Sequence, residues 1–203
     1  MTSEAEPLRW ISPVTPADEA EQHELGMVEV RRLHQMRRGL PLPDELVAAT
    51  RAIRTRPFRP GVDDTDWLSV NNRAFSWHPD QGGWDEARLR SRLAEPWVDL
   101  DGFLVHDGED GHLDGFCWTK VHPAADDEPA MGEIFVIAAD PRTHGTGLGR
   151  ALTVAGLEHL SAAGLTVGML YVEADNTPAV ALYGRLGFVV HHSDAAFAPA
   201  PRR

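Results

Sequence analysis

A glycine-rich segment between an apolar stretch and an amphipathic stretch constrains this chain more than any other feature. Residues 133–139 are almost entirely apolar, which predicts a buried strand. Leucine and valine recur at helical spacing over residues 147–163, which predicts a helix. The segment between them reads Asp140-Pro141-Arg142-Thr143-His144-Gly145-Thr146-Gly147-Leu148-Gly149-Arg150. Glycines let a backbone approach a ligand closely, and the N–H groups that begin a helix attract anions, so the segment predicts a phosphate site.

Taken alone, these glycines are equally consistent with a flexible turn. The surrounding pattern favours the first interpretation, because strand and helix signals alternate from residue 52 onward and predict an α/β fold, a mixed sheet flanked by helices. The predicted strands are residues 52–58, 102–106, 113–121, 133–139, 165–172 and 187–190. The predicted helices are residues 63–75, 85–94, 147–163 and 177–186, with Asp63 or Asp64 as a cap of the first.

The N-terminal quarter differs from the rest. Residues 1–24 are acidic and contain three prolines, so we expect a mobile segment. Residues 25–50 open with a strand-like stretch, Leu25 to Val30, and continue through a proline-flanked linker. We therefore expect one α/β domain over residues 51–198, followed by a short tail over residues 199–203.

Charge and cysteine content exclude several classes of function. Lys and Arg total 19 against 31 Asp and Glu, for a formal net charge of −12, which argues against nucleic acid or an anionic membrane as partner. Cys117 is the single cysteine and is expected to be a core thiol. The histidines show no ligand spacing, so we expect no metal. The chain shows neither signal-peptide pattern nor a long apolar run, so a cytoplasmic location is expected.

Two motifs in order carry a resemblance to the GNAT acetyltransferase superfamily. The acetyl-CoA motif Gln/Arg-x-x-Gly-x-Gly/Ala falls on residues 144–149, with His144 in place of the usual Gln or Arg. The second motif follows as Asn176, Ala179, Tyr183 and then Leu-Gly-Phe at residues 186–188. The resemblance implies the GNAT fold, acetyl-CoA as co-substrate and a small-molecule amine as the acceptor.

Residues 71–84, 115–123 and 132–136 narrow the resemblance to the mycothiol synthase family. Such enzymes acetylate the cysteinyl amine of cysteinyl-glucosaminyl-inositol and carry two tandem acetyltransferase domains, of which the second is catalytic. The match covers about residues 25–198. It implies that residues 25–50 are the remnant of a first domain, and Leu25 to Val30 loosely repeats residues 186–191, although chance repetition explains that equally. Such a strand needs a partner, either the edge of its own sheet or a second subunit in a homodimer.

The resemblance also assigns roles to residues. Glu133 is the expected base, with an ion-paired sheet-end carboxylate as the alternative, and Tyr183 is the expected acid, with a helix-anchoring aromatic as the alternative. The implied acetyl-CoA contacts are Ile137, Ala138, Ala139, His144, Gly145, Thr146, Gly147, Leu148, Gly149, Arg150, Asn176 and Ala179. The implied acceptor contacts are Asp80, Lys120, Glu133 and Tyr171.

Two of these residues, Asp80 and Lys120, are nearly as consistent with exposed loop charges. The tryptophans are expected to be core residues, with a place in the acceptor cleft as the alternative for Trp118, beside Lys120. Three functions remain open: mycothiol formation, acetylation of another small amine or of a peptide N-terminus, and a non-catalytic acetyl-CoA-binding module.

Overall fold

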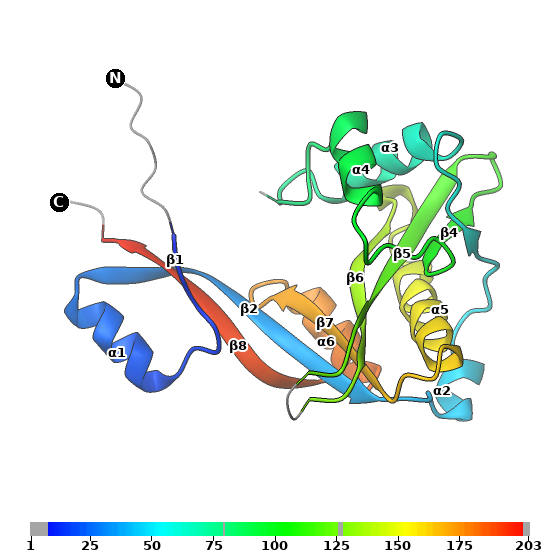
Figure 1. Ribbon diagram of the computed structural model, residues 1–203. Helices are drawn as coiled ribbons and strands as arrows, with labels where there is room; N and C mark the ends of the chain where they lie inside the picture. The colour runs from blue at the N-terminus through cyan, green and yellow to red at the C-terminus, as the bar shows by residue number, and fades with distance from the viewer. Residues whose placement is uncertain (1–7, 79, 126–127, 201–203) are drawn as a thin grey trace, which may run out of the picture. The chain divides into compact units, whose positions relative to one another are not determined.

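The computed structural model describes residues 8–78, 80–125 and 128–200 and separates into two compact units (Figure 1). The terminal unit combines the N-terminal residues up to Arg38 with the C-terminal residues from Met169 onward. The central unit runs from Gly39 to Gly168. These two units do not coincide with the residue ranges expected from the sequence, because both ends of the chain contribute to the terminal unit.

The central unit contains four antiparallel strands in the order β6-β5-β4-β3. Their bounds are β3 (Arg56–Pro57), β4 (Phe103–Asp107), β5 (Leu113–His122) and β6 (Met131–Ala139). Residues 108–112 join β4 to β5, as expected between the two predicted strands, whereas the strand expected over residues 52–58 shrinks to two residues. Lys120 lies opposite Glu133 on the paired strands β5 and β6, below a bulge that follows Trp118.

Helices cover both faces of β5 and β6. The helices of the central unit are α2 (Asp44–Ala48), α3 (Asp64–Ala74), α4 (Glu86–Leu93) and α5 (Leu148–Ala162). Both α3 and α5 pack against β5 and β6. Successive side chains of a strand face opposite sides, and Cys117 and Ile134 face Gly156 of α5. The aromatic side chain of Trp118 faces the other side and meets Trp67 of α3.

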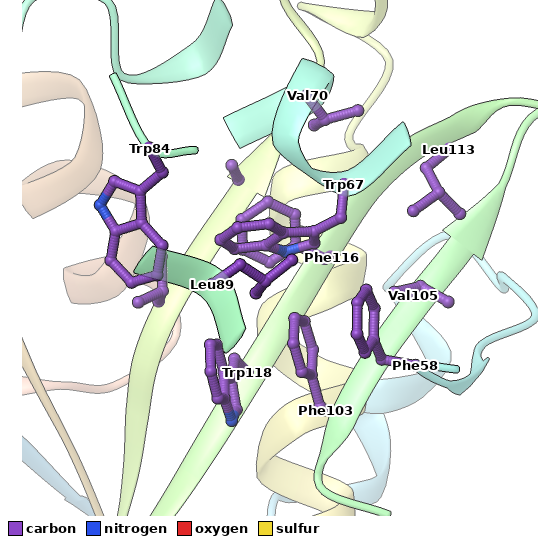
Figure 2. Packing of buried hydrophobic residues seen from close by; sticks show 12 residues of the cluster. Phe58, Trp67, Val70, Trp84, Leu89, Phe103, Val105, Leu113, Phe116 and Trp118 are labelled. Carbon is purple, nitrogen blue, oxygen red and sulfur yellow. The ribbon is translucent and has the colours of Figure 1, made fainter. Parts of the chain in front are cut away.

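An aromatic cluster forms the core under α3 (Figure 2). Phe103 stacks between Phe58 and Trp118, with ring centroids 4.3 Å and 4.2 Å away. Trp67 meets the edge of this stack and is 1% exposed. Stacked and edge-on aromatic pairs add to the stability that burial alone provides, so β4 and β5 are held rigidly under the helix.

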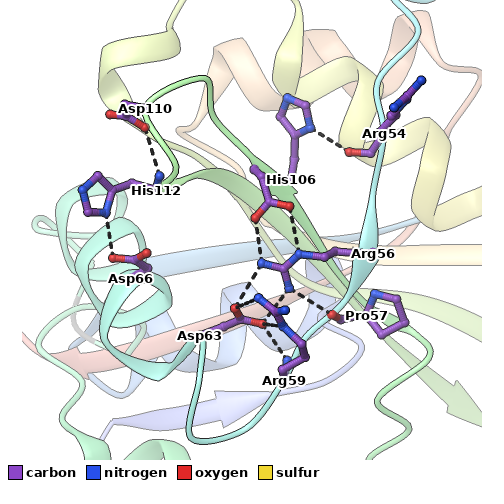
Figure 3. Close-up of polar contacts among 10 residues, drawn as sticks. Arg54, Arg56, Pro57, Arg59, Asp63, Asp66, His106, Asp110 and His112 are labelled. Carbon is purple, nitrogen blue, oxygen red and sulfur yellow. Dashed lines mark hydrogen bonds and ion pairs between the residues drawn. The ribbon is translucent and has the colours of Figure 1, made fainter.

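The aspartates before α3 and α4 play different parts, and a cap was predicted only for α3. Asp85 caps α4 as a side-chain acceptor for the Arg88 N–H at 2.8 Å. Asp63 precedes α3 without capping it, and its buried carboxylate accepts hydrogen bonds from Arg56 and Arg59 instead (Figure 3). Burial alone would raise the pKa of Asp63, but the hydrogen bonds from Arg59 and Arg56 outweigh it and lower that pKa.

The terminal unit contains strands in the order β1-β8-β2-β7. Its elements are β1 (Arg9–Ile11), α1 (Pro16–Glu24), β2 (Met27–Gly39), β7 (Val167–Glu173, from Met169 in this unit), α6 (Thr177–Arg185) and β8 (Val189–Pro199). Residues 9–24, expected to be mobile, therefore carry a strand and a helix. Thr15 and Asp18 form a capping box that begins α1, a local signal that the acidic composition concealed.

Strand β2 extends far beyond the six residues that its apolar pattern indicated. It pairs antiparallel with β8 from Met27, opposite Pro199, to Arg37, opposite Val189. The Arg31 guanidinium donates to the Glu173 carboxylate at 2.6 Å, so this charged side chain of β2 has its partner within the unit. Of the two partners considered for this segment, the structure gives it a strand of its own chain. Among the described residues, no helix is long and apolar enough to cross a membrane.

Candidate active site

The glycine-rich segment lies between β6 and α5, as its pattern predicts. A single 3-10 turn, Pro141–Thr143, follows β6, and Gly147 is the residue before α5. Gly145 and Gly147 have φ angles of 80° and 83°, in the left-handed region that glycine occupies without strain. Gly147 brings no side chain to cap the helix, so the N–H groups of the first turn of α5 remain available to an anion.

Buried Asp140 fixes the start of this segment. Its carboxylate accepts a hydrogen bond from the Arg142 N–H at 2.9 Å and pairs with the Arg73 guanidinium of α3. Burial alone would raise the pKa of Asp140, but these hydrogen bonds outweigh it and lower that pKa. Arg142 also pairs with Asp110 at 3.1 Å, so its guanidinium braces the segment against the β4–β5 turn.

The other residues of this unit that are expected to contact acetyl-CoA lie at the end of β6, in the glycine-rich segment and at the start of α5. Ala138 is buried, while Ile137 and Ala139 are half-buried. His144 and Thr146 are exposed. Arg150 donates from Nε to the Thr50 hydroxyl at 3.0 Å, which holds its side chain beside the first turn of α5.

Glu133, Lys120 and His122 lie together on one face of β5 and β6. The Glu133 carboxylate is 9% exposed, and its Oε2 lies 2.7 Å from His122 Nε2. Lys120 is directly opposite Glu133 in the strand pairing. The sequence patterns singled out Glu133 and Lys120 but missed His122. Its position two residues after Lys120 on a strand was the available signal, because alternate residues share a face.

Lys120 rests on an aromatic platform rather than in a solvated loop. Its Nζ lies 4.9 Å from the ring centroid of Trp97 and 5.7 Å from that of Phe135. These are cation–π distances, which fix the ammonium over the rings. Trp118 is fully buried, so the expectation of a core residue is confirmed and the alternative of a cleft residue is wrong. The bulge in β5 leaves Trp118 under α3, and Trp97 takes the place beside Lys120.

Asp80 lies in the turn between α3 and α4 and is held through its backbone. Its carbonyl oxygen accepts from the Trp84 indole N–H at 3.2 Å and from the Arg88 guanidinium at 2.7 Å. Asn71 of α3 donates its amide to the Gln81 carbonyl at 2.7 Å and so ties the same turn to the helix. Side chains of both flanking helices therefore hold the backbone of Asp80 and Gln81.

The terminal unit holds the remaining predicted residues. Asn176 caps α6, and its side-chain oxygen accepts from the Ala179 N–H at 3.3 Å. Tyr183 lies on the same helix, is 8% exposed and packs edge-on against Phe188 at 5.9 Å. The structure thus groups Asp80, Lys120, Glu133 and the glycine-rich segment in the central unit, and Tyr171, Asn176, Ala179 and Tyr183 in the terminal unit.

A buried glutamine of β2, Gln35, holds Tyr171, and the sequence patterns did not indicate this contact. Gln35 Nε2 donates to the Tyr171 hydroxyl oxygen at 2.7 Å, and Arg37 Nε donates to Gln35 Oε1 at 2.7 Å. Gln35 is 5% exposed and Tyr171 is 40% exposed, so a fixed amide orients an accessible phenol.

Replacing Gln35 by leucine should raise the KM for the amine acceptor about fivefold. The reason is that Tyr171 loses one hydrogen bond, worth about 1 kcal/mol net, while the volume of the side chain is kept. Steady-state kinetics with the acceptor varied measures this change. Ser193→Ala is the matched control, because it removes the 2.9 Å contact that His34 of β2 makes with β8 and leaves the contact between β2 and Tyr171 of β7 untouched. An equal rise in KM for both variants would contradict the role of Gln35.

Replacing Tyr183 by phenylalanine should lower kcat by about 10- to 100-fold and leave the affinity for acetyl-CoA nearly unchanged. The substitution keeps the ring that packs against Phe188 and removes only the hydroxyl, the expected proton donor to the coenzyme A thiolate. Single-turnover kinetics measures the chemical step, and a melting curve checks the packing. Full turnover when chemistry limits the rate would exclude Tyr183 as an essential acid.

Comparisons with known proteins show the family and the fold of the chain. Residues 67–188 match the family model described as the acetyltransferase (GNAT) family. A crystal structure of a GCN5-related N-acetyltransferase from Sphaerobacter thermophilus superposes with a TM-score of 0.76 at 22% identity, covering 97% of this chain and 60% of that chain. The chain belongs to the GNAT acetyltransferase family, and the predicted mixed α/β fold of that family is confirmed.

The similarity to curated proteins is more specific than the family match. A mycothiol acetyltransferase of Mycobacteroides abscessus is 48% identical over 193 residues, which are 94% of this chain and 64% of the relative. A mycothiol acetyltransferase of Segniliparus rotundus is 45% identical over 191 residues, covering 93% of this chain and 71% of the relative. The chain thus spans about two thirds of the length of these relatives. Among the described residues, no group of three or more His, Cys, Asp or Glu side chains is arranged to hold a metal ion.

Proposed function

We propose that this chain is an acetyl-CoA-dependent N-acetyltransferase that acetylates the cysteinyl amine of cysteinyl-glucosaminyl-inositol to form mycothiol. The observation that carries the proposal is the pairing of the glycine-rich segment at the start of α5 with a buried carboxylate, Glu133, earlier on β6. The names of the curated relatives, at 45% and 48% identity over more than nine tenths of this chain, support the choice of acceptor.

Acetyl-CoA binds, on this proposal, along β6 and the glycine-rich segment. The pyrophosphate meets the free N–H groups at the start of α5, where the partial positive charge of the helix favours an anion. The backbone of Ile137, Ala138 and Ala139 pairs with the pantetheine arm, and one N–H of this stretch polarises the thioester carbonyl. His144, Gly145, Thr146, Gly147, Leu148, Gly149 and Arg150 line the pyrophosphate, and Asn176 and Ala179 complete the set from α6.

The chemistry needs a neutral amine, a polarised thioester and a proton for the departing thiolate. An α-amine titrates near pH 8, so most of it carries a proton at neutral pH and a base is required. Glu133 takes that proton, the amine attacks the thioester carbon, and the Tyr183 hydroxyl protonates the sulfur of coenzyme A. The second proton, which the nitrogen loses as the amide forms, restores the Tyr183 hydroxyl, so each turnover releases one proton. Asp80, Lys120 and Tyr171 contact the acceptor, whose hydroxyl groups suit polar partners that are held in place.

The experiment is an incubation of the chain with isotope-labelled acetyl-CoA and cysteinyl-glucosaminyl-inositol, with the product followed by mass spectrometry. A colour reagent for the thiol of coenzyme A is unsuitable, because the acceptor carries a thiol itself. We expect one acetyl group on the cysteinyl nitrogen. Binding of coenzyme A without transfer to any amine would contradict the proposed function and favour a non-catalytic acetyl-CoA-binding module.

A further inference from the structure

We propose that His122 and Glu133 form a dyad, in which His122 is a positioning residue that holds the Glu133 carboxylate and passes its proton to solvent. This inference rests on the proposed function, because Glu133 is there the acceptor of the amine's proton. The 2.7 Å separation between His122 Nε2 and Glu133 Oε2 carries it. The two atoms lie at the distance of a charge-assisted hydrogen bond.

The strand register explains why the two side chains meet. Lys120 lies opposite Glu133, and His122 lies opposite Met131, so Glu133 and His122 are diagonal neighbours on β6 and β5. Diagonal neighbours on one face are within reach of long side chains. The Glu133 side chain is 9% exposed and the His122 side chain is 32% exposed. The dyad therefore connects a buried carboxylate to an imidazole that reaches water.

The His122 imidazole has a role in removing the proton that each turnover places on Glu133. Each turnover moves one proton from the acceptor ammonium to the Glu133 carboxylate, and that proton must leave before the next acceptor binds. In the resting state the His122 ring carries its proton at Nε2 and donates it to the Glu133 carboxylate. Once Glu133 is protonated, exchange with water moves the ring proton to Nδ1, and the Nε2 lone pair accepts the proton of the Glu133 carboxyl. The imidazolium then releases its Nδ1 proton to water, which returns the ring to its resting tautomer. The net result is one proton transferred from the amine to solvent, with Glu133 again ionised.

Charged side chains from the neighbouring elements lie on the same face as the dyad. Lys120 stands opposite Glu133 on the neighbouring strand, over Trp97. Arg92 of α4 lies 5.8 Å from the ring centroid of Phe135 on the same face. Arg73 of α3 is engaged by Asp140 near the other end of β6, and α5 brings His159 to the opposite face, next to Gly102. Of these groups, His122 is the one whose hydrogen-bond contact with Glu133 the structure shows.

The test compares His122→Gln with the wild type and with a matched control, His112→Gln. His112 also contacts a carboxylate, with its Nδ1 3.1 Å from Asp66 Oδ1, but it lies in the β4–β5 turn. For His122→Gln we expect kcat to fall about tenfold with the KM for acetyl-CoA unchanged, and the acid side of the kcat–pH profile to change shape, because glutamine holds Glu133 but carries no proton away. Added imidazole should restore part of the rate of His122→Ala. A His122→Gln profile that overlays the wild type, or no rescue by imidazole, would overturn the relay.

Nuclear magnetic resonance separates the dyad from the proposed function. In the Glu133→Gln variant the ring-nitrogen resonances of His122 should move, while those of His112 stay in place. Unmoved His122 resonances would overturn the dyad whatever the activity. If the wild type acetylates no amine while the His122 resonances move, the proposed function fails, the pair stands as a structural contact and the relay is overturned.

Discussion

Replacing Gly149 by valine should lower the affinity for acetyl-CoA by about 100-fold, a loss of about 2.7 kcal/mol of binding free energy. Gly149 is the second residue of α5, and a Cβ added there meets no atom of the protein within 4 Å. The valine side chain would therefore project into the space that the pyrophosphate needs, at little direct cost to the fold. Isothermal titration calorimetry measures the affinity.

Gly149 tests the segment better than Gly145 or Gly147 does. Those two glycines have positive φ angles, so any side chain there strains the backbone as well as the site. Ala162→Val is the matched control, because it places the same β-branched side chain at an exposed position in the last turn of α5. Equal affinities for Gly149→Val and the wild type would contradict the assignment of this segment to the pyrophosphate.

Replacing Glu133 by glutamine should lower the acetylation rate by about 100-fold near pH 6 and much less near pH 9. The sign follows from the acceptor: below the pKa of an α-amine, near pH 8, the amine is mostly protonated and needs the base, whereas above it the amine is already neutral. Glutamine has the shape of glutamate and still offers a carbonyl oxygen to His122. Rates measured across this pH range, with acetyl-CoA saturating, report the effect.

Glu86→Gln serves as the control for Glu133→Gln. Glu86 is an exposed carboxylate of the same unit, paired with Arg90 at 3.2 Å on the surface of α4. We expect its rate to equal that of the wild type throughout the pH range. A loss in Glu133→Gln that is the same at every pH would contradict the role of a base and point to the positioning of the acceptor.

The central unit could be predicted largely from the sequence because its signals are local. Glycines at residues 145, 147 and 149, after an apolar run and before a helical pattern, indicate the strand, turn and helix at the correct positions. The Asp85 cap of α4 is likewise local. Asp63 was one of two predicted caps of α3, but its carboxylate pairs with Arg56, seven residues earlier in the chain. No spacing rule favours that contact over a cap.

The N-terminal part of the terminal unit was predicted poorly because its order depends on contacts distant in sequence. Strand β2 contains two pairs of adjacent arginines, which read as a polar stretch, yet it pairs with β8 about 160 residues later in the chain. Arg31 is neutralised by Glu173, and Gln35 is occupied by Tyr171. Each of these partners is invisible to a local pattern. The same reason hid His122, whose only distinguishing contact is with the neighbouring strand.

The most direct test of the account is a competition between amine acceptors in one reaction. The wild-type chain is incubated with limiting acetyl-CoA and an equimolar mixture of cysteinyl-glucosaminyl-inositol, glucosaminyl-inositol, free cysteine and a peptide with a free N-terminus, and the acetylated products are quantified by mass spectrometry. The account predicts that nearly all of the acetyl group appears on the cysteinyl nitrogen of cysteinyl-glucosaminyl-inositol, and that Glu133→Gln lowers the yield of that product. Acetylation mainly of the peptide or of glucosaminyl-inositol would contradict the proposed acceptor, and the absence of every acetylated product would contradict catalysis itself.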